Sequence, residues 1–249
     1  MKKQLSVFGL FARSSIFKVL GILFLMGAVE ALFFQMELRD ALEAYEAGKF
    51  LPSLERIFSQ AAANAYFRVA LVLITVVLCL PGCEFKSHTS YTLRRLSVRE
   101  RTTFLHQAAY NTLVYGMLLA AQLVVIYALS CYYIAAAPVE CVSNQTLTLA
   151  FYRNAFLHSI LPLEDIGLWI RNGLLIVCLG LTTAEYPYSQ RRKKFSWNAL
   201  VLVMYVIAYF DREIGDLWNV ILTGFVALMM IGEVVHALMK KDEEVIQYE

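Results

Sequence analysis

The segment in which charged and apolar side chains alternate most densely lies between Tyr91 and Phe104 and reads YTLRRLSVRERTTF. Ser97 can cap a following helix, with Glu100 at the capping-box position. A short amphipathic helix of this kind can dock into a groove on a partner, where arginines select an acidic surface. The alternative is ordinary positive charge beside lipid headgroups. The residues expected to contact such a partner are Leu93, Arg94, Arg95, Leu96, Val98, Arg99, Glu100 and Arg101.

Glu30 is a second candidate, because it interrupts a long apolar run near the N-terminus. A carboxylate inside lipid is costly and usually faces protein or a water-filled cavity. Glu30 is therefore a candidate for a substrate path or a proton contact. The alternative is an ion pair with Arg68 or Arg171 at the outer ends of neighbouring helices. Glu185 is interpreted similarly, as a partner for the basic cluster 191–194.

Motifs of nucleotide hydrolysis, zinc proteolysis and serine hydrolysis are absent, namely G-x-x-x-x-G-K-[ST], H-E-x-x-H and G-x-S-x-G. Glu233 and His236 have the i, i+3 spacing of carboxylate-bridged metal sites, which require a second such pair. The other histidines, His88, His106 and His158, do not supply one, so a solvated helix end is favoured. The 5 cysteines have no zinc-ligand spacing, and no disulfide is expected. We predict no enzyme activity, no metal and no cofactor.

The composition indicates a membrane protein: 59% of the 249 residues are hydrophobic and only 17% are charged, whereas soluble domains carry about a quarter charged residues. The apolar residues form blocks close to the roughly twenty residues that a helix needs to cross a bilayer. The sequence therefore predicts an all-α polytopic membrane protein whose single transmembrane domain covers residues 1–249. The predicted spans are approximately 15–34, 67–80, 113–136, 168–186, 199–210 and 219–238.

The distribution of positive charge predicts the orientation. With the N-terminus in the cytoplasm, 15 lysines and arginines lie inside and 7 outside, and such an excess marks the cytoplasmic side. Both termini are therefore predicted to be cytoplasmic. The first apolar run is about twenty residues long and lacks a good cleavage site, which favours a span over a signal peptide. The net charge of +2 is too small to indicate nucleic-acid binding.

Helical periodicity continues between the spans. Residues 37–66 predict an outer helical hairpin that turns near Gly48–Pro52. Segment 144–161 is too interrupted to span and is predicted to lie at the outer interface. The third span continues from a polar stretch that starts near Val98, so its helix is expected to project into the cytoplasm.

The segment from Thr92 to Arg101, set between the second and third of six spans with both termini inside, resembles the permeases of ABC-2-type transporters. The resemblance implies that segment 91–104 is a coupling helix that meets a cytoplasmic ATPase. It implies a second permease subunit, identical or related, and ATP bound by the partner rather than by this chain. The location implied is a cell membrane, bacterial inner or plasma membrane. The outer hairpin is longer than expected for that family, and the connection 211–218 is shorter.

The alternatives to a permease are a stand-alone carrier or substrate-capturing subunit and an intramembrane enzyme. A stand-alone carrier or substrate-capturing membrane subunit would show an inverted repeat or paired broken helices, and none is evident in the sequence. An intramembrane enzyme would cluster Glu, His or Asn on facing helices, whereas the polar residues here are scattered. An apolar path suits lipids, peptides and drugs alike, so the prediction covers the class of protein and not its substrate.

Overall fold

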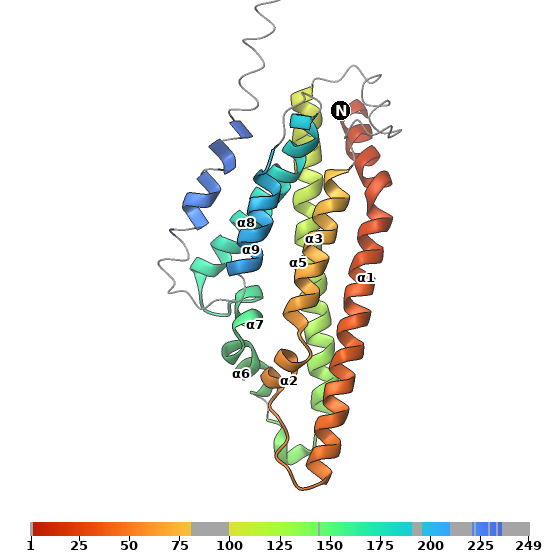
Figure 1. The fold of residues 1–249 in the computed structure, drawn as a ribbon, viewed down its shortest axis with the longest axis vertical. Coiled ribbons are helices and arrows are strands. Elements are labelled where there is room, and N and C mark those ends of the chain that lie inside the picture. Colours follow the sequence, from red (N-terminus) through yellow and green to blue (C-terminus); the bar gives the residue numbers. More distant parts are fainter. Residues whose placement is uncertain are drawn as a thin grey trace, which may run out of the picture.

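The computed structural model describes residues 2–80, 100–143, 145–190 and 196–209, together with 221, 223–228, 230–232 and 234–235. Throughout these residues the chain is helical or in short turns, without a strand, so the predicted all-α class is confirmed (Figure 1). The helices are α1 Lys2–Glu46, α2 Leu54–Gln60, α3 Ala63–Cys79, α5 Glu100–Ala136, the 3-10 turn η1 Val139–Cys141, α6 Thr146–Arg153, α7 Ala155–Ile160, α8 Ile166–Gln190 and α9 Asn198–Tyr209.

Helix α1 is the longest element, with 45 residues and no proline. At about 1.5 Å per residue it is roughly 68 Å long, more than twice the hydrocarbon thickness of about 30 Å. Its buried side chains include Val19, Met26, Phe34 and Leu38, whose spacing places them on one helix face. Because α1 greatly exceeds a membrane-spanning length, part of it must project beyond the bilayer in any transmembrane placement.

The chain reverses after α1 at residues 47–53, where Gly48 has a φ of 85°. Only glycine adopts this left-handed conformation without a steric penalty. A second left-handed residue, Ala62 with a φ of 52°, separates α2 from α3, and the two helices are bent by 50°. The segment 37–66 therefore consists of the end of α1, the turn, α2 and the start of α3.

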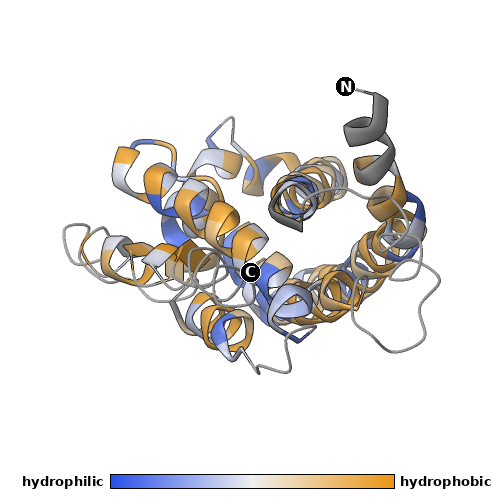
Figure 2. Ribbon diagram, turned by 90° about the horizontal axis from the view of Figure 1, so that it is seen from above, coloured by the Kyte–Doolittle hydropathy of each residue, from blue (hydrophilic) through white to orange (hydrophobic). Residues whose placement is uncertain are grey.

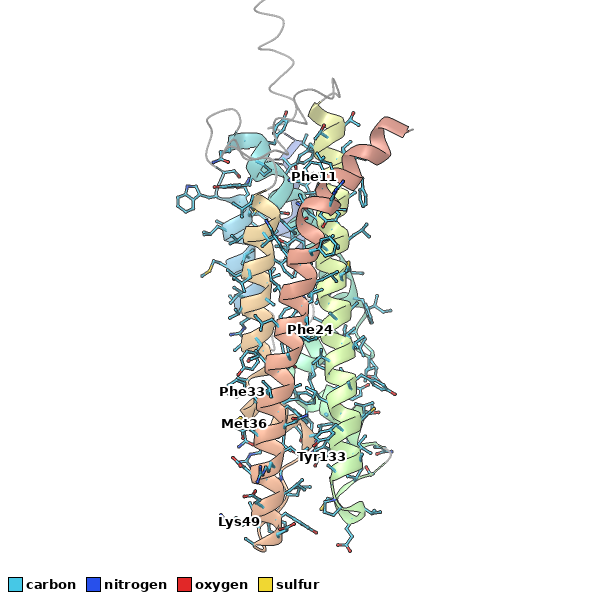
Figure 3. All side chains as sticks on the ribbon, turned by 90° about the vertical axis from the view of Figure 1, so that its right-hand side faces the viewer. Phe11, Phe24, Phe33, Met36, Lys49 and Tyr133 are labelled. Carbon is cyan, nitrogen blue, oxygen red and sulfur yellow. The ribbon has the colours of Figure 1, made fainter. Side chains whose placement is uncertain are left out.

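The helix ends are segregated between the two ends of the molecule. The N-terminus of α1, the C-terminus of α3, the N-terminus of α5 and the C-terminus of α8 lie at one end, which we call the N-terminal end (Figure 1). The turn after α1, the C-terminus of α5, and helices α6 and α7 lie toward the opposite end, which we call the hairpin end. Figure 3 shows the same division, with Phe11 near the first end and Lys49 at the second.

Helices α1, α5 and α8 are each long and apolar enough to cross a membrane, and the bent pair α2 and α3 qualifies if it counts as one span. Helix α9 and the region Thr223–Gly232 are apolar but shorter. The described residues therefore include three clear candidate spans and a fourth that is bent, and the six-span count remains a prediction.

Apolar side chains also cover the outside of the bundle. Phe17 and Phe24 of α1 are 79% and 80% exposed, and the hydropathy colouring in Figure 2 shows apolar residues around the helices rather than only between them. Phe24, Phe33 and Met36 lie along the outer side of α1 in Figure 3. A soluble protein seldom exposes so large an apolar surface, whereas lipid-facing helices require one.

Candidate functional site

Helix α5 packs against α1, α3 and α8. It forms polar contacts with all three. Several of its polar side chains are buried where it packs against these helices. Polar groups that are removed from water need hydrogen-bond partners, and between membrane helices such bonds join one helix to the next. The polar residues of α5 that are buried are Thr103, Gln107, Asn111, Gln122 and Ser130.

Among the described residues, side-chain hydrogen bonds join α5 to three different helices. The hydroxyls of Tyr110 and Ser15 of α1 are 2.8 Å apart, and those of Tyr115 and Thr75 of α3 are 2.9 Å apart. The Asn111 amide donates to the Thr183 hydroxyl of α8 over 3.0 Å. Each bond connects side chains that are far apart in the sequence, so α5 is the helix that couples the positions of the other three.

The close crossing of α5 and α8 depends on Gly180. A Cβ atom at this position would lie 2.8 Å from the backbone nitrogen of Thr112 and 3.0 Å from the carbonyl oxygen of Ala108. Small residues allow membrane helices to approach in this way. Nearer the N-terminal end, the ring centroids of Phe104 and Tyr188 are 5.8 Å apart, which continues the α5–α8 contact.

Glu30 of α1 lies opposite Gln122 of α5, and both side chains are 0% exposed. The Gln122 amide nitrogen is 3.0 Å from each carboxyl oxygen of Glu30. The predicted alternative partners, Arg68 and Arg171, are not the residues that bind this carboxyl group. Arg171 instead donates to the carbonyl oxygen of Ser159 and the side-chain oxygen of its neighbour Asn172. Among the described residues, the group that binds the Glu30 carboxyl is therefore the neutral Gln122 amide of α5 rather than a guanidinium.

Glu185 near the end of α8 receives hydrogen bonds from neutral donors as well. Its carboxyl oxygens accept from Ser189, from Ser196 and, over 2.9 Å, from the Asn198 amide at the start of α9. These bonds fix α9 against α8. The basic cluster 191–194, which the sequence suggested as its partner, lies outside the described residues.

The predicted partner-binding segment is described only at its end. Leu93, Arg94, Arg95, Leu96, Val98 and Arg99 lie outside the described residues, whereas Glu100 and Arg101 begin α5. The last residues of the predicted segment, Thr103 and Phe104, are 5% and 2% exposed and pack into the bundle. Any docking surface in segment 91–104 must therefore be formed by residues that precede Thr103.

The remaining candidates are the Glu233–His236 pair and the cysteines. Glu233 and His236 lie outside the described residues. No group of His, Cys, Asp or Glu that could hold a metal ion occurs in the part of the chain that is described. Cys79, Cys131, Cys141 and Cys178 form no disulfide within the described residues.

A pocket of about 330 Å³ opens at the hairpin end, between α2 and the α6–α7 region. Arg153 of α6 reaches Glu55 of α2 across it over 3.5 Å. The Asn154 amide donates to the backbone carbonyl of Glu55 over 3.2 Å. The remaining wall includes the polar Arg56 and Asn64 and the apolar Phe58 and Phe156, so the lining is mixed.

Comparisons with protein-family models, with curated proteins and with solved structures find no match for this chain. The function is therefore inferred from the sequence and from the contacts between the helices.

Sequence reasoning missed the polar face of α5. Gln107, Asn111 and Tyr115 are four residues apart, and Gln122 follows after seven, a spacing that places them near one helix face. Polar residues at this spacing inside an apolar run are a signal that could have identified the face.

Proposed function

We propose that the chain is the membrane-spanning permease subunit of an ATP-driven transporter, and that segment 91–104 docks a separate cytoplasmic ATPase. The observation that carries this proposal is the continuity of α5. The helix begins at Glu100, within the last part of the arginine-rich segment, and runs unbroken to Ala136. A displacement of the segment would therefore act on one rigid element that is about 55 Å long.

The contacts of α5 provide the route by which such a displacement would reach the rest of the bundle. Movement of its first turns would act on α8 through the Phe104–Tyr188 contact and the Asn111–Thr183 hydrogen bond. It would act on α1 through the Tyr110–Ser15 hydrogen bond. Packed helices of this kind shift between discrete arrangements rather than deform continuously. Transport would follow from a change in helix packing that ATP hydrolysis in the partner drives.

The proposed assembly contains two ATPase subunits and a second permease, identical or related. ATP would be bound by the ATPase, since the sequence has no phosphate-binding loop. The exposed apolar residues of α1 and α5, such as Phe24 and Val124, would face lipid and the second permease. The location that fits these partners is a cell membrane, with both termini in the cytoplasm and six spans.

The pocket at the hairpin end supports a second candidate function, a stand-alone carrier or substrate-capturing membrane subunit. Its walls combine the Arg153–Glu55 pair with Arg56, and Arg56 is exposed. A polar ligand held there would lie at the end opposite to segment 91–104. This alternative needs no ATPase, which distinguishes it from the permease.

The orientation of the chain is the first requirement of the proposed function, because a cytoplasmic ATPase can reach segment 91–104 only from inside. In a variant without native cysteines, we expect cysteines introduced at Ser87 and Ser196 to resist an impermeant thiol reagent in intact cells. A cysteine at Ser53, in the turn after α1, should be labelled. Labelling at Ser87 together with protection at Ser53 would place the segment outside and exclude the proposal.

A further inference from the structure

We propose that the Glu30–Gln122 pair is a proton-binding site between α1 and α5, in which Glu30 is held as a neutral carboxylic acid. The inference does not depend on ATP-driven transport, because it rests on the hydrogen bonds within this pair.

The first observation is an imbalance of donors and acceptors. The single amide nitrogen of Gln122 is 3.0 Å from both carboxyl oxygens of Glu30. The amide oxygen of Gln122 is buried and has no hydrogen-bond partner. A carboxylate can only accept hydrogen bonds, so an ionised Glu30 leaves that amide oxygen without a donor. A buried acceptor without a partner destabilises the folded state.

One proton removes the imbalance. A neutral Glu30 has a hydroxyl that can donate to the amide oxygen of Gln122, while the amide nitrogen donates to the other carboxyl oxygen. The amide can turn about its terminal torsion, for which the energy profile is broad, to bring its oxygen toward this hydroxyl. The two side chains then form a closed pair in which each group both donates and accepts.

The second observation is that the site is closed. Glu30 and Gln122 are both 0% exposed. One helical turn away, a Cβ atom at Gly27 would lie 3.0 Å from a methyl group of Val125, so α1 and α5 are in close contact beside the pair. Tyr66 of α3 is a titratable neighbour of Glu30. Tyr66 stacks on Phe33, with ring centroids 5.4 Å apart.

These surroundings favour the neutral acid over a metal cation. A bound cation requires several oxygen ligands, and no group of acidic, His or Cys side chains that could hold one occurs among the described residues. A proton needs only the one unpaired acceptor that is present. The proton would come from water, and it would return to water if α1 and α5 separated enough to hydrate Glu30. The pair therefore links proton release to opening of the α1–α5 contact.

Infrared spectroscopy of the purified full-length protein in lipid vesicles tests this inference. At neutral pH, the wild type should show the carbonyl stretching band of a hydrogen-bonded carboxylic acid, and the band should shift in D₂O. Glu30→Gln should remove the band. Glu46→Gln, at the exposed end of the same helix, is the matched control and should leave it unchanged.

A second variant keeps the test decisive if Glu30→Gln does not fold. Gln122→Leu removes the amide, so the acid band should persist but move to higher frequency, because its carbonyl loses a hydrogen bond. Absence of a carboxylic acid band from the wild type at neutral pH would overturn the inference. A band that is unaffected by Glu30→Gln, or whose frequency is unchanged in Gln122→Leu, would also overturn it.

Discussion

Replacing Leu96 by Asp is expected to abolish recovery of the ATPase with this chain while leaving its insertion into the membrane intact. Leu96 belongs to the apolar anchor of segment 91–104, and a carboxylate there would have to be buried in the partner's groove. An apolar residue that fills such a pocket typically contributes on the order of 2 kcal/mol, which corresponds to more than a tenfold loss of affinity. The measurement is co-purification from the native host, with the amount of chain in the membrane determined in parallel.

The arginine face should be tested in a separate variant. Replacing Arg94, Arg95, Arg99 and Arg101 by Gln removes charge but retains long side chains with good helix propensity. Attraction to an acidic groove should weaken, and recovery of the ATPase should fall by more than tenfold. Wild-type association should weaken as ionic strength rises, whereas the residual binding of this variant should respond less.

A matched control for both variants lies at the hairpin end. Lys49→Gln also removes a positive charge, but Lys49 is at the opposite end of the bundle from the start of α5 (Figure 3). ATPase recovery should equal that of the wild type. If the Leu96 and arginine variants retain the ATPase as well as Lys49→Gln does, segment 91–104 is not the docking element.

Gly180→Ala is expected to destabilise the bundle strongly, although it adds only one carbon atom. The new Cβ would lie 2.8 Å from the Thr112 nitrogen and 3.0 Å from the Ala108 carbonyl oxygen, and both of these are backbone atoms. A backbone cannot rotate aside as a side chain can, so α5 and α8 would have to separate. Overpacking of this kind costs about 1–3 kcal/mol, and Gly180→Leu should cost more.

The measurement for Gly180 can use a native thiol. Cys178 is buried on the same helix, so its reaction with a thiol-reactive dye during heating reports the separation of α8 from its neighbours. The other cysteines would first be replaced. Gly173→Ala is the matched control, since a Cβ there meets nothing within 4 Å, and alanine should raise stability slightly through its helix propensity. Equal melting temperatures of Gly180→Ala and Gly173→Ala would show that the crossing is not tight.

The sequence predicted the helical class because apolar blocks and helical periodicity are local properties. The long apolar run of α1 and the glycine at position 48 lie within single segments, and their effects on the backbone do not depend on distant residues. The number of spans was harder to predict. Helix α9 has 12 residues, fewer than a bilayer normally requires, so hydropathy alone does not define its role.

Partners across helix interfaces could not be predicted in the same way. Glu30 was recognised as unusual, but electrostatics suggested an arginine, and the structure brings Gln122 to it from 92 residues away. An amide and a guanidinium are equally reasonable partners until the rotation of α5 is known. The Gly180 contact also depends on two helices crossing at one point, which no local pattern encodes.

The central claim, that segment 91–104 is the surface that docks an ATPase, is tested most directly by site-specific photocrosslinking. A photoreactive amino acid at position 96 should form a crosslink to a cytoplasmic ATP-binding subunit. The same group at position 50 should not, because Phe50 is 100% exposed but follows Lys49 in the turn at the hairpin end (Figure 3). Crosslinking from position 96 alone is the result that the proposal predicts. Failure of position 96 to capture any ATP-binding protein, in cells where the wild-type chain is correctly inserted, would contradict it and favour a stand-alone carrier.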